Sequence, residues 1–165
     1  MNHSNNSELN LIDTKFSNLQ SNFIANPYPS LIERKRVLSK IKMIILNNEN
    51  KFYEALEKDF RRRCKLDSLV GDIISVVTMI NYLLANLRKW MKSEPRKIQL
   101  AVFPGKVSVV YQPLGVIGII GPYNFPMNLT LVPLVTAISA GNRALVKLSE
   151  LTPNTNKLFI ILQMN

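Results

Sequence analysis

Residues 116 to 126 read VIGIIGPYNFP, and this stretch decides the fold. Its short apolar run, rich in β-branched residues, predicts a buried strand rather than a helix. Gly121-Pro122 ends the strand, and Pro126 lies where a helix can begin. Ligands of open α/β sheets bind at the carboxyl ends of strands, so Asn124 is placed where its side-chain amide can face a ligand. An asparagine that only caps a turn is the alternative interpretation.

The residues that follow predict a strand–helix–strand unit. Residues 127–140 form an apolar helical pattern that stops at Gly141-Asn142, and residues 143–148 read as a second buried strand. Such a unit has two parallel strands joined by a right-handed crossover, which makes the fold class α/β. Thr152-Pro153 then predicts the cap and the first position of another helix.

Two parallel strands do not make a finished domain. We therefore expect Val116, Ile119 and Val146 to be only partly shielded from water, a condition that favours association.

The part of the chain before residue 98 has a helical period. Apolar residues at steps of three and four predict amphipathic helices over about 9–24, 31–46 and 51–60, and from Asp67 to the Glu94-Pro95 stop. Residues 1 to about 7 are expected to be disordered. Ser30, with Glu33 three residues later, predicts a capping box. The apolar residues on one face of the longest helix are consistent with either a coiled-coil seam or a helix packed in a globular core. This apolar stripe consists of Leu69, Ile73, Val77, Ile80, Leu84, Leu87 and Met91.

A β-hairpin is predicted between the two halves, with strands at 98–102 and 106–112 around Phe103-Pro104-Gly105. The chain thus divides into a helical segment (1–97), a hairpin segment (98–114) and a strand–helix–strand segment (115–165). Glycines 115, 118 and 121 do not match the GxGxxG dinucleotide fingerprint. We interpret them as points of close backbone approach.

Lys147, Ser149 and Glu150 fall at the carboxyl end of the second strand. Dinucleotide sites of this topology place groups that reach the adenosine ribose there, and a lysine and a carboxylate can both hydrogen-bond vicinal hydroxyls. An ion pair at the end of a strand is the alternative.

The charge and the apolar pattern of the sequence limit the classes of function that the chain can have. The 165 residues carry a formal charge of +10, and the basic excess lies almost wholly before Lys106. A solvated helical surface explains this excess better than a specific nucleic-acid site, because aromatic residues are not interleaved with the basic ones. No uninterrupted apolar segment predicts a membrane span or a signal peptide, so a cytoplasmic protein is expected.

Cys64 is the only cysteine and His3 the only histidine, which excludes an intrachain disulfide and a Cys/His zinc site, and we predict no metal site. Cys64 follows three arginines that could favour its thiolate, but no histidine or acid with a recognisable motif accompanies it.

A family resemblance rests on these motifs taken together. Residues 111–126, Pro133-Leu134, Ala140-Gly141-Asn142 and residues 147–153 match, in order and spacing, the segment in which aldehyde dehydrogenases enter the cofactor domain. Residues 55–60 and 87–91 also fit. The chain resembles the N-terminal portion of that family, nearest to the coniferyl-aldehyde-dehydrogenase branch and the fatty-aldehyde enzymes.

The resemblance implies oxidation of an aldehyde to the acid with NAD or NADP. A cysteine attacks the aldehyde, hydride passes to the nicotinamide, and a glutamate-activated water releases the acid. By the motif match, Asn124 helps to bind the oxyanion, Gly121, Pro122 and Tyr123 line the nicotinamide side with Asn124, and Lys147, Ser149 and Glu150 lie at the ribose. The third segment is then the first, truncated part of a Rossmann-like NAD(P)-binding domain.

The resemblance also implies a homodimer or homotetramer for the complete enzyme. Two departures stand against activity of this chain by itself. Leu148 replaces the motif's proline, and the family's nucleophilic cysteine and general-base glutamate match nothing here. We therefore expect the chain alone to be inactive. A non-catalytic remnant, or an interaction fragment with a basic helical surface, is the alternative.

Overall fold

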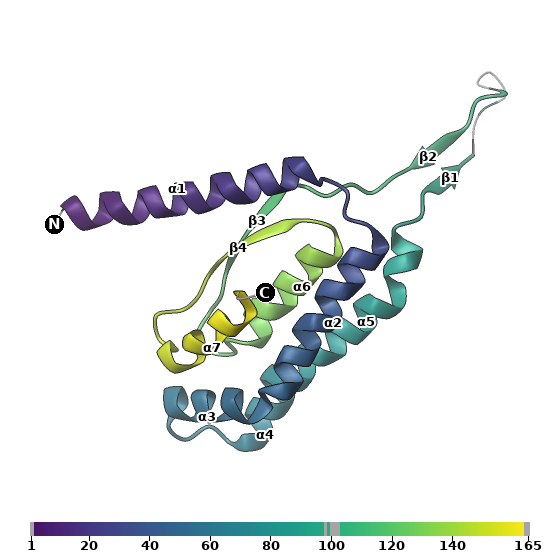
Figure 1. Cartoon of the computed structure of the whole chain (residues 1–165). Coiled ribbons are helices and arrows are strands. Elements are labelled where there is room, and N and C mark those ends of the chain that lie inside the picture. Colours follow the sequence, from purple (N-terminus) through teal and green to yellow (C-terminus); the bar gives the residue numbers. More distant parts are fainter. Residues whose placement is uncertain (1, 98, 100–102, 164–165) are drawn as a thin grey trace.

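The computed structural model describes residues 2–97, 99 and 103–163. Its first half is helical, and its second half contains two small sheets with two further helices (Figure 1). The helical elements of the first half are α1 (Asn2–Ala25), α2 (Leu31–Asn47), α3 (Glu49–Phe60), α4 (Lys65–Ser68), the π-helical segment η1 (Leu69–Ile74) and α5 (Ser75–Trp90). The later elements are β1 (Glu94–Arg96), β2 (Val107–Val109), β3 (Val116–Ile120), α6 (Asn128–Ser139), β4 (Arg143–Lys147) and α7 (Pro153–Gln163).

The predicted strand–helix–strand unit is confirmed. β3 and β4 pair in parallel, from Val116 opposite Arg143 to Ile120 opposite Lys147, and α6 forms the crossover. Figure 1 shows α6 against one side of this strand pair, and α1 also contacts both strands. The α/β fold class is therefore correct, with a Rossmann-like beginning built on two strands.

The burial of the β3–β4 strand pair differs from the prediction at Ile119. Val116 and Val146 are half-buried as predicted, but Ile119 is buried, and its neighbour Ile120 is 81% exposed. Successive side chains of a strand point to opposite faces. Ile119 and Ile120 therefore differ in burial because, at this end of β3, only the face that carries Ile119 is covered.

The hydrophobic core lies where α2, α5 and α6 pack on one another (Figure 1). The predicted capping box at the start of α2 is confirmed: Ser30 Oγ accepts from Glu33 N at 3.2 Å, and Glu33 Oε2 accepts from Ser30 N at 2.6 Å. The fully or almost fully buried apolar side chains of the core are Leu38, Ile41, Ile45, Phe52, Leu56, Ile73, Val76, Ile80, Leu83, Leu87, Met127, Leu131, Val135 and Phe159.

The stripe predicted for the longest helix is partly wrong. Ile73, Ile80 and Leu87 are buried as predicted. Val76 and Leu83 are buried although the prediction omitted them, whereas Leu69, Val77 and Leu84 are only partly buried and Met91 is exposed. Two of the errors fall in pairs of adjacent apolar residues, Val76-Val77 and Leu83-Leu84, where a period of three and four fits either member. The helix packs in a globular core rather than in a coiled coil.

One helix among the described residues, Lys65–Trp90, is long and apolar enough by length and composition to cross a membrane. Core helices of soluble proteins pass the same test. One face of this helix packs against α2 and α6 in the core.

The hairpin is present, but its first strand begins earlier than predicted. Glu94 pairs with Val109 and Arg96 with Val107, so pairing starts where the sequence indicated only a helix stop. A proline is tolerated at an edge strand, which allows Pro95 to lie in this strand. The predicted first strand falls at Ile98–Val102, of which residues 98 and 100–102 lie outside the described residues.

Two helix starts also differ. α1 begins at Asn2, so the expected disorder is wrong for residues 2–7; extending an existing helix costs far less than nucleating one. Thr152 precedes α7 as predicted, but the first amides of that helix donate to Asp59 of α3. A carboxylate from a distant helix thus replaces the local cap.

Candidate functional site

The ends of β3 and β4 bring the two groups of predicted site residues to one edge of the sheet. The parallel register places Ile120 opposite Lys147, and Gly121 N donates to Lys147 O at 2.8 Å. The turn that follows β3 therefore begins beside the loop that follows β4.

Gly121 is fixed by close packing against α6. A Cβ atom at this position would collide with Thr130 Oγ1, so a larger residue cannot occupy the same backbone position. Close approach is thus confirmed for Gly121 but is wrong for Gly118, where an added Cβ would meet no atom within 4 Å. Gly115 instead has a φ of 120°, which L side chains rarely adopt.

Asn124 lies at the surface of the turn between β3 and α6. Pro122 is half-buried, whereas Tyr123 and Asn124 are exposed. Among the residues that the structure describes, the side-chain amide of Asn124 makes no hydrogen bond. The first amides of α6 are satisfied by another residue, so this asparagine has no capping contact with them.

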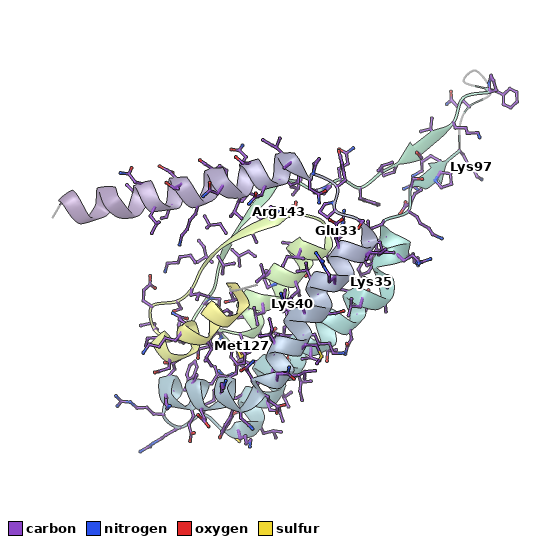
Figure 2. The ribbon with its side chains drawn as sticks, viewed as in Figure 1. Glu33, Lys35, Lys40, Lys97, Met127 and Arg143 are labelled. Atoms are coloured by element: carbon purple, nitrogen blue, oxygen red, sulfur yellow. The ribbon has the colours of Figure 1, made fainter. Side chains whose placement is uncertain are left out.

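That residue is Asp72 of η1, which sequence reasoning did not single out. Its Oδ1 accepts from Met127 N and from Asn128 N, each at 3.0 Å, and its side chain is fully buried. Figure 2 shows Met127 where α6 begins, among the side chains that join α6 to the helical half. The carboxylate thereby caps the positive end of the α6 dipole.

Arg63 pairs with Asp72 and reaches the same turn. Its Nη2 lies 2.8 Å from Asp72 Oδ2, and its Nη1 donates to Asn124 O at 3.2 Å. Burial raises the pKa of the Asp72 carboxyl above its ordinary value, and the Asn128 amide, the Arg63 guanidinium and the Met127 amide offset only part of that rise.

One signal in the sequence could have indicated Asp72. Asp72 is the only acidic residue between Asp67 and Glu94, and it stands next to Ile73 in an apolar stripe. Arg63 is the last of the three arginines before Cys64, and nothing in the sequence separates it from the other two, yet its side chain is only 9% exposed, unlike the exposed Arg61 and Arg62.

At the end of β4, Lys147 and Glu150 form an ion pair, as the alternative interpretation expected. Their side chains are 56% and 76% exposed. The hydrogen bond from Lys147 lowers the pKa of Glu150. Ser149 behaves differently, because it is buried and its Oγ accepts from Leu151 N at 3.3 Å. Its carbonyl accepts from Asn156 Nδ2 at 2.6 Å, which holds this loop to α7.

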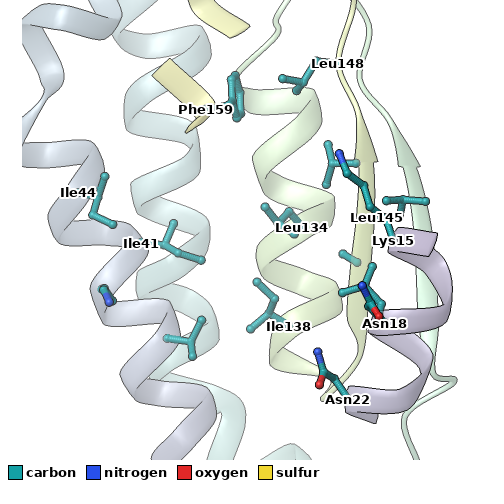
Figure 3. A pocket seen from close by; sticks show the side chains of 15 residues that line it. Lys15, Asn18, Asn22, Ile41, Ile44, Leu134, Ile138, Leu145, Leu148 and Phe159 are labelled. Atoms are coloured by element: carbon teal, nitrogen blue, oxygen red, sulfur yellow. The ribbon is translucent and has the colours of Figure 1, made fainter. Parts of the chain in front are cut away.

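A cleft of about 350 Å³ opens beside Asn124. The described residues that line it come from α3, the loop before α4, the α4–η1 helix and the turn after β3: Phe60, Arg63, Asp67, Val70, Gly71, Asn124 and Phe125. A larger cavity of about 550 Å³ lies elsewhere, among α1, α2, α6, β4 and α7 (Figure 3). Its lining is mainly aliphatic, with Lys15, Asn18 and Asn22 on one side, and it includes none of the predicted site residues.

Cys64 is exposed at the start of α4 and has no disulfide partner. Within the described ranges, no three histidine, cysteine, aspartate or glutamate residues lie close enough together to hold a metal ion.

Comparison with known proteins gives a consistent picture. The model of the aldehyde dehydrogenase family matches residues 20–164. A probable coniferyl aldehyde dehydrogenase from Pseudomonas aeruginosa is 34% identical over 151 residues, which are 92% of this chain and 32% of the relative. The coniferyl aldehyde dehydrogenase of a Pseudomonas species is 40% identical over 116 residues, 70% of this chain and 24% of that protein.

Solved structures agree. The substrate-bound structure of Staphylococcus aureus AldH superposes with a TM-score of 0.87 at 32% identity, and the match covers 92% of this chain and 33% of that one. A succinic semialdehyde dehydrogenase from Streptococcus pyogenes in complex with NADP⁺ has a TM-score of 0.79 at 19% identity, over 92% of this chain and 32% of that one, which shows the fold alone. The chain spans about a third or less of the length of these relatives.

Proposed function

Because this chain belongs to the aldehyde dehydrogenase family, we propose that it is the N-terminal part of an enzyme that oxidises an aldehyde to the carboxylic acid with NAD or NADP. The exposed amide of Asn124, at the carboxyl end of β3 and beside the end of β4, is the observation that carries the proposal. The names of the relatives favour a coniferyl-type aldehyde, and an aliphatic aldehyde is the other candidate.

In this proposal Asn124 donates its side-chain N–H to the aldehyde oxygen as that oxygen becomes negative. Such donors act best when their position is fixed before the reaction, because no reorganisation is then needed. The backbone of Asn124 is held by Arg63, while its amide is free of other hydrogen bonds among the described residues. A free donor on a fixed backbone is the arrangement that this role needs.

The residues at the two strand ends fit a nicotinamide dinucleotide. Lys147 Nζ and the Glu150 carboxylate are exposed and supply a donor and an acceptor for the vicinal hydroxyls of a ribose, once their ion pair opens. Gly121, Pro122 and Tyr123 form the adjacent surface. Ser149 supports this surface by holding the loop, because its Oγ accepts from Leu151 N and its carbonyl accepts from Asn156 Nδ2. The cofactor supplies the acceptor for the hydride that the aldehyde loses.

The chain by itself is inactive in this proposal, because the motif match assigns neither the nucleophile nor the general base to any of its residues. The proposal includes a cytoplasmic homodimer or homotetramer for the complete enzyme, on the family resemblance alone. Nucleic acid is not a partner.

The test uses a complete enzyme in which this chain replaces the corresponding first third of the Staphylococcus aureus relative. Aldehyde-dependent reduction of NAD or NADP is expected. Asn124→Ala is expected to lower kcat and kcat/KM together by about 10²–10³, the usual cost of one oxyanion donor. Cofactor affinity should stay close to that of the parent. Turnover within a few-fold of the parent would show that Asn124 is not the donor.

A further inference from the structure

Arg63 and Asp72 together hold both ends of the segment that carries Asn124. Arg63 Nη1 donates to the carbonyl of Asn124 at the start of this segment. Asp72 Oδ1 accepts from the amides of Met127 and Asn128 at its end. The two side chains are joined to each other, with Arg63 Nη2 2.8 Å from Asp72 Oδ2, so one buried ion pair holds the backbone from Asn124 to Asn128.

The guanidinium of Arg63 has little freedom to move. It lies between two aromatic rings, 4.9 Å from the centroid of Phe60 and 4.6 Å from that of Phe125. Gly71 makes room for this stack, because a Cβ there would come within 2.6 Å of the Phe125 ring. A planar fork that stacks and bonds at once is a property of arginine that lysine lacks.

The local helix geometry places Asp72 for this contact. Asp72 lies within η1, where the helix widens to π geometry, and Ser75 Oγ donates to Val70 O five residues earlier at 2.7 Å. π-helical turns inside α-helices occur frequently at functional sites.

We propose that Arg63 and Asp72 are positioning residues, which set the orientation of the Asn124 amide by fixing the backbone at Asn124 and at the start of α6. This inference rests on the proposed role of Asn124 as the oxyanion donor. Neither residue touches the reacting atoms. Displacement of a catalytic group by about 1 Å can cost about 10²-fold in rate. Loss of the Arg63 and Asp72 contacts should therefore slow the reaction even when the protein still folds.

The experiment measures Arg63→Lys in the complete hybrid enzyme, alone and combined with Asn124→Ala, with Arg62→Lys as the control. Arg62 is the exposed neighbour of Arg63, and its replacement should leave kcat unchanged. Arg63→Lys should lower kcat by about 10- to 100-fold while the dissociation constant of the cofactor, read by fluorescence, changes less than about two-fold. Unfolding temperatures are recorded for each variant.

The double variant separates positioning from a general loss of structure. If Arg63 acts through Asn124, Arg63→Lys has nothing left to misplace in an Asn124→Ala enzyme, and kcat should fall by less than about two-fold further. Independent, multiplying effects of the two substitutions would overturn the inference, as would an Arg63→Lys enzyme with the parental kcat.

Asp72→Asn is the second variant. If Arg63→Lys does not fold, Asp72→Asn is measured in its place, alone and combined with Asn124→Ala, and the same fall in kcat is expected. It keeps the shape and one acceptor oxygen but removes the charge that holds the guanidinium. The single Asn124→Ala variant distinguishes the two levels of the account. If it leaves turnover unchanged, the proposed function fails at this residue and the inference with it. If it slows turnover while Arg63→Lys and Asp72→Asn do not, only the inference fails.

Discussion

Asn124 depends on side chains that lie far from it in the sequence. Its carbonyl is bound by Arg63, 61 positions earlier, and the helix that follows it is capped by Asp72. The motif around Asn124 thus contains the side-chain amide that we propose as the oxyanion donor, while the side chains that hold its backbone come from the helical half.

Lys147→Ala should weaken cofactor binding more than it slows the reaction, the reverse of Asn124→Ala. The substitution removes the donor that we propose for the ribose but leaves the turn after β3 intact. Dissociation constants for NAD and NADP, with kcat at saturating cofactor, check this expectation. Lys157→Ala, an exposed lysine on α7, is the control. Unchanged cofactor affinity in Lys147→Ala would remove this residue from the site.

Gly121→Ala should destabilise the protein by about 1–3 kcal/mol, the usual cost of forcing atoms into a packed site. The added Cβ meets Thr130 Oγ1, and Thr130 is a buried residue in the first turn of α6. Gly118→Ala is the matched control in the same strand, because the space around it is open. Denaturant unfolding of both variants measures the difference, and equal stabilities would contradict the packing argument.

At the scale of the elements, side chains from the helical half bind both ends of α6 and the start of α7. Asp72 caps the start of α6, and Arg34 Nη1 donates to Ser139 O at its end at 3.0 Å. Asp59 accepts from the amides of Asn154 and Thr155 at the start of α7. Acids at the starts of helices and a base at an end match the helix dipoles.

Asp59→Ala should cost about 0.5–2 kcal/mol, the range for loss of a helix cap. Although burial would raise the pKa of Asp59, hydrogen bonds from Thr155 and Asn154 hold it below its ordinary value of 3.8. A lowered pKa means that the carboxylate stabilises the fold above that value, and that this contribution is lost as pH falls through the lower, folded-state pKa.

The difference in unfolding free energy between parent and Asp59→Ala should therefore shrink as pH is lowered below about 3.8. Glu57→Ala, an exposed acid on the same helix, is the control. A difference that stays constant down to the acid transition would show that the charged form of Asp59 does not matter.

The sequence allowed prediction of the elements better than prediction of their contacts. The strand–helix–strand unit and the Ser30–Glu33 capping box follow from local patterns, and both are confirmed. The caps supplied by Asp59 and Asp72 could not be predicted in the same way, because they join residues more than 50 positions apart.

For the whole molecule, the main fact is that the chain spans about a third or less of its relatives. Its parallel sheet has two strands among the described residues, and Ile120 is exposed on one face of it. The aliphatic cavity of about 550 Å³ lies against β4 (Figure 3). We expect the isolated chain to self-associate or to unfold without a sharp transition, because apolar surface of this kind promotes association. Light scattering after gel filtration, with a thermal melt, tests this; a dispersed monomer with a cooperative melt would contradict it.

The central claim is that this chain supplies the oxyanion donor and part of the cofactor site, but not the nucleophile, of an aldehyde dehydrogenase. The most direct measurement is the absorbance of reduced cofactor when the isolated chain and the hybrid enzyme are each incubated with NAD or NADP and coniferyl or aliphatic aldehydes. We predict no reduction by the isolated chain, turnover by the hybrid, and a loss of about 10²–10³ in that turnover with Asn124→Ala. Reduction by the isolated chain that disappears in Cys64→Ser would contradict the account, because the nucleophile would then lie in this chain.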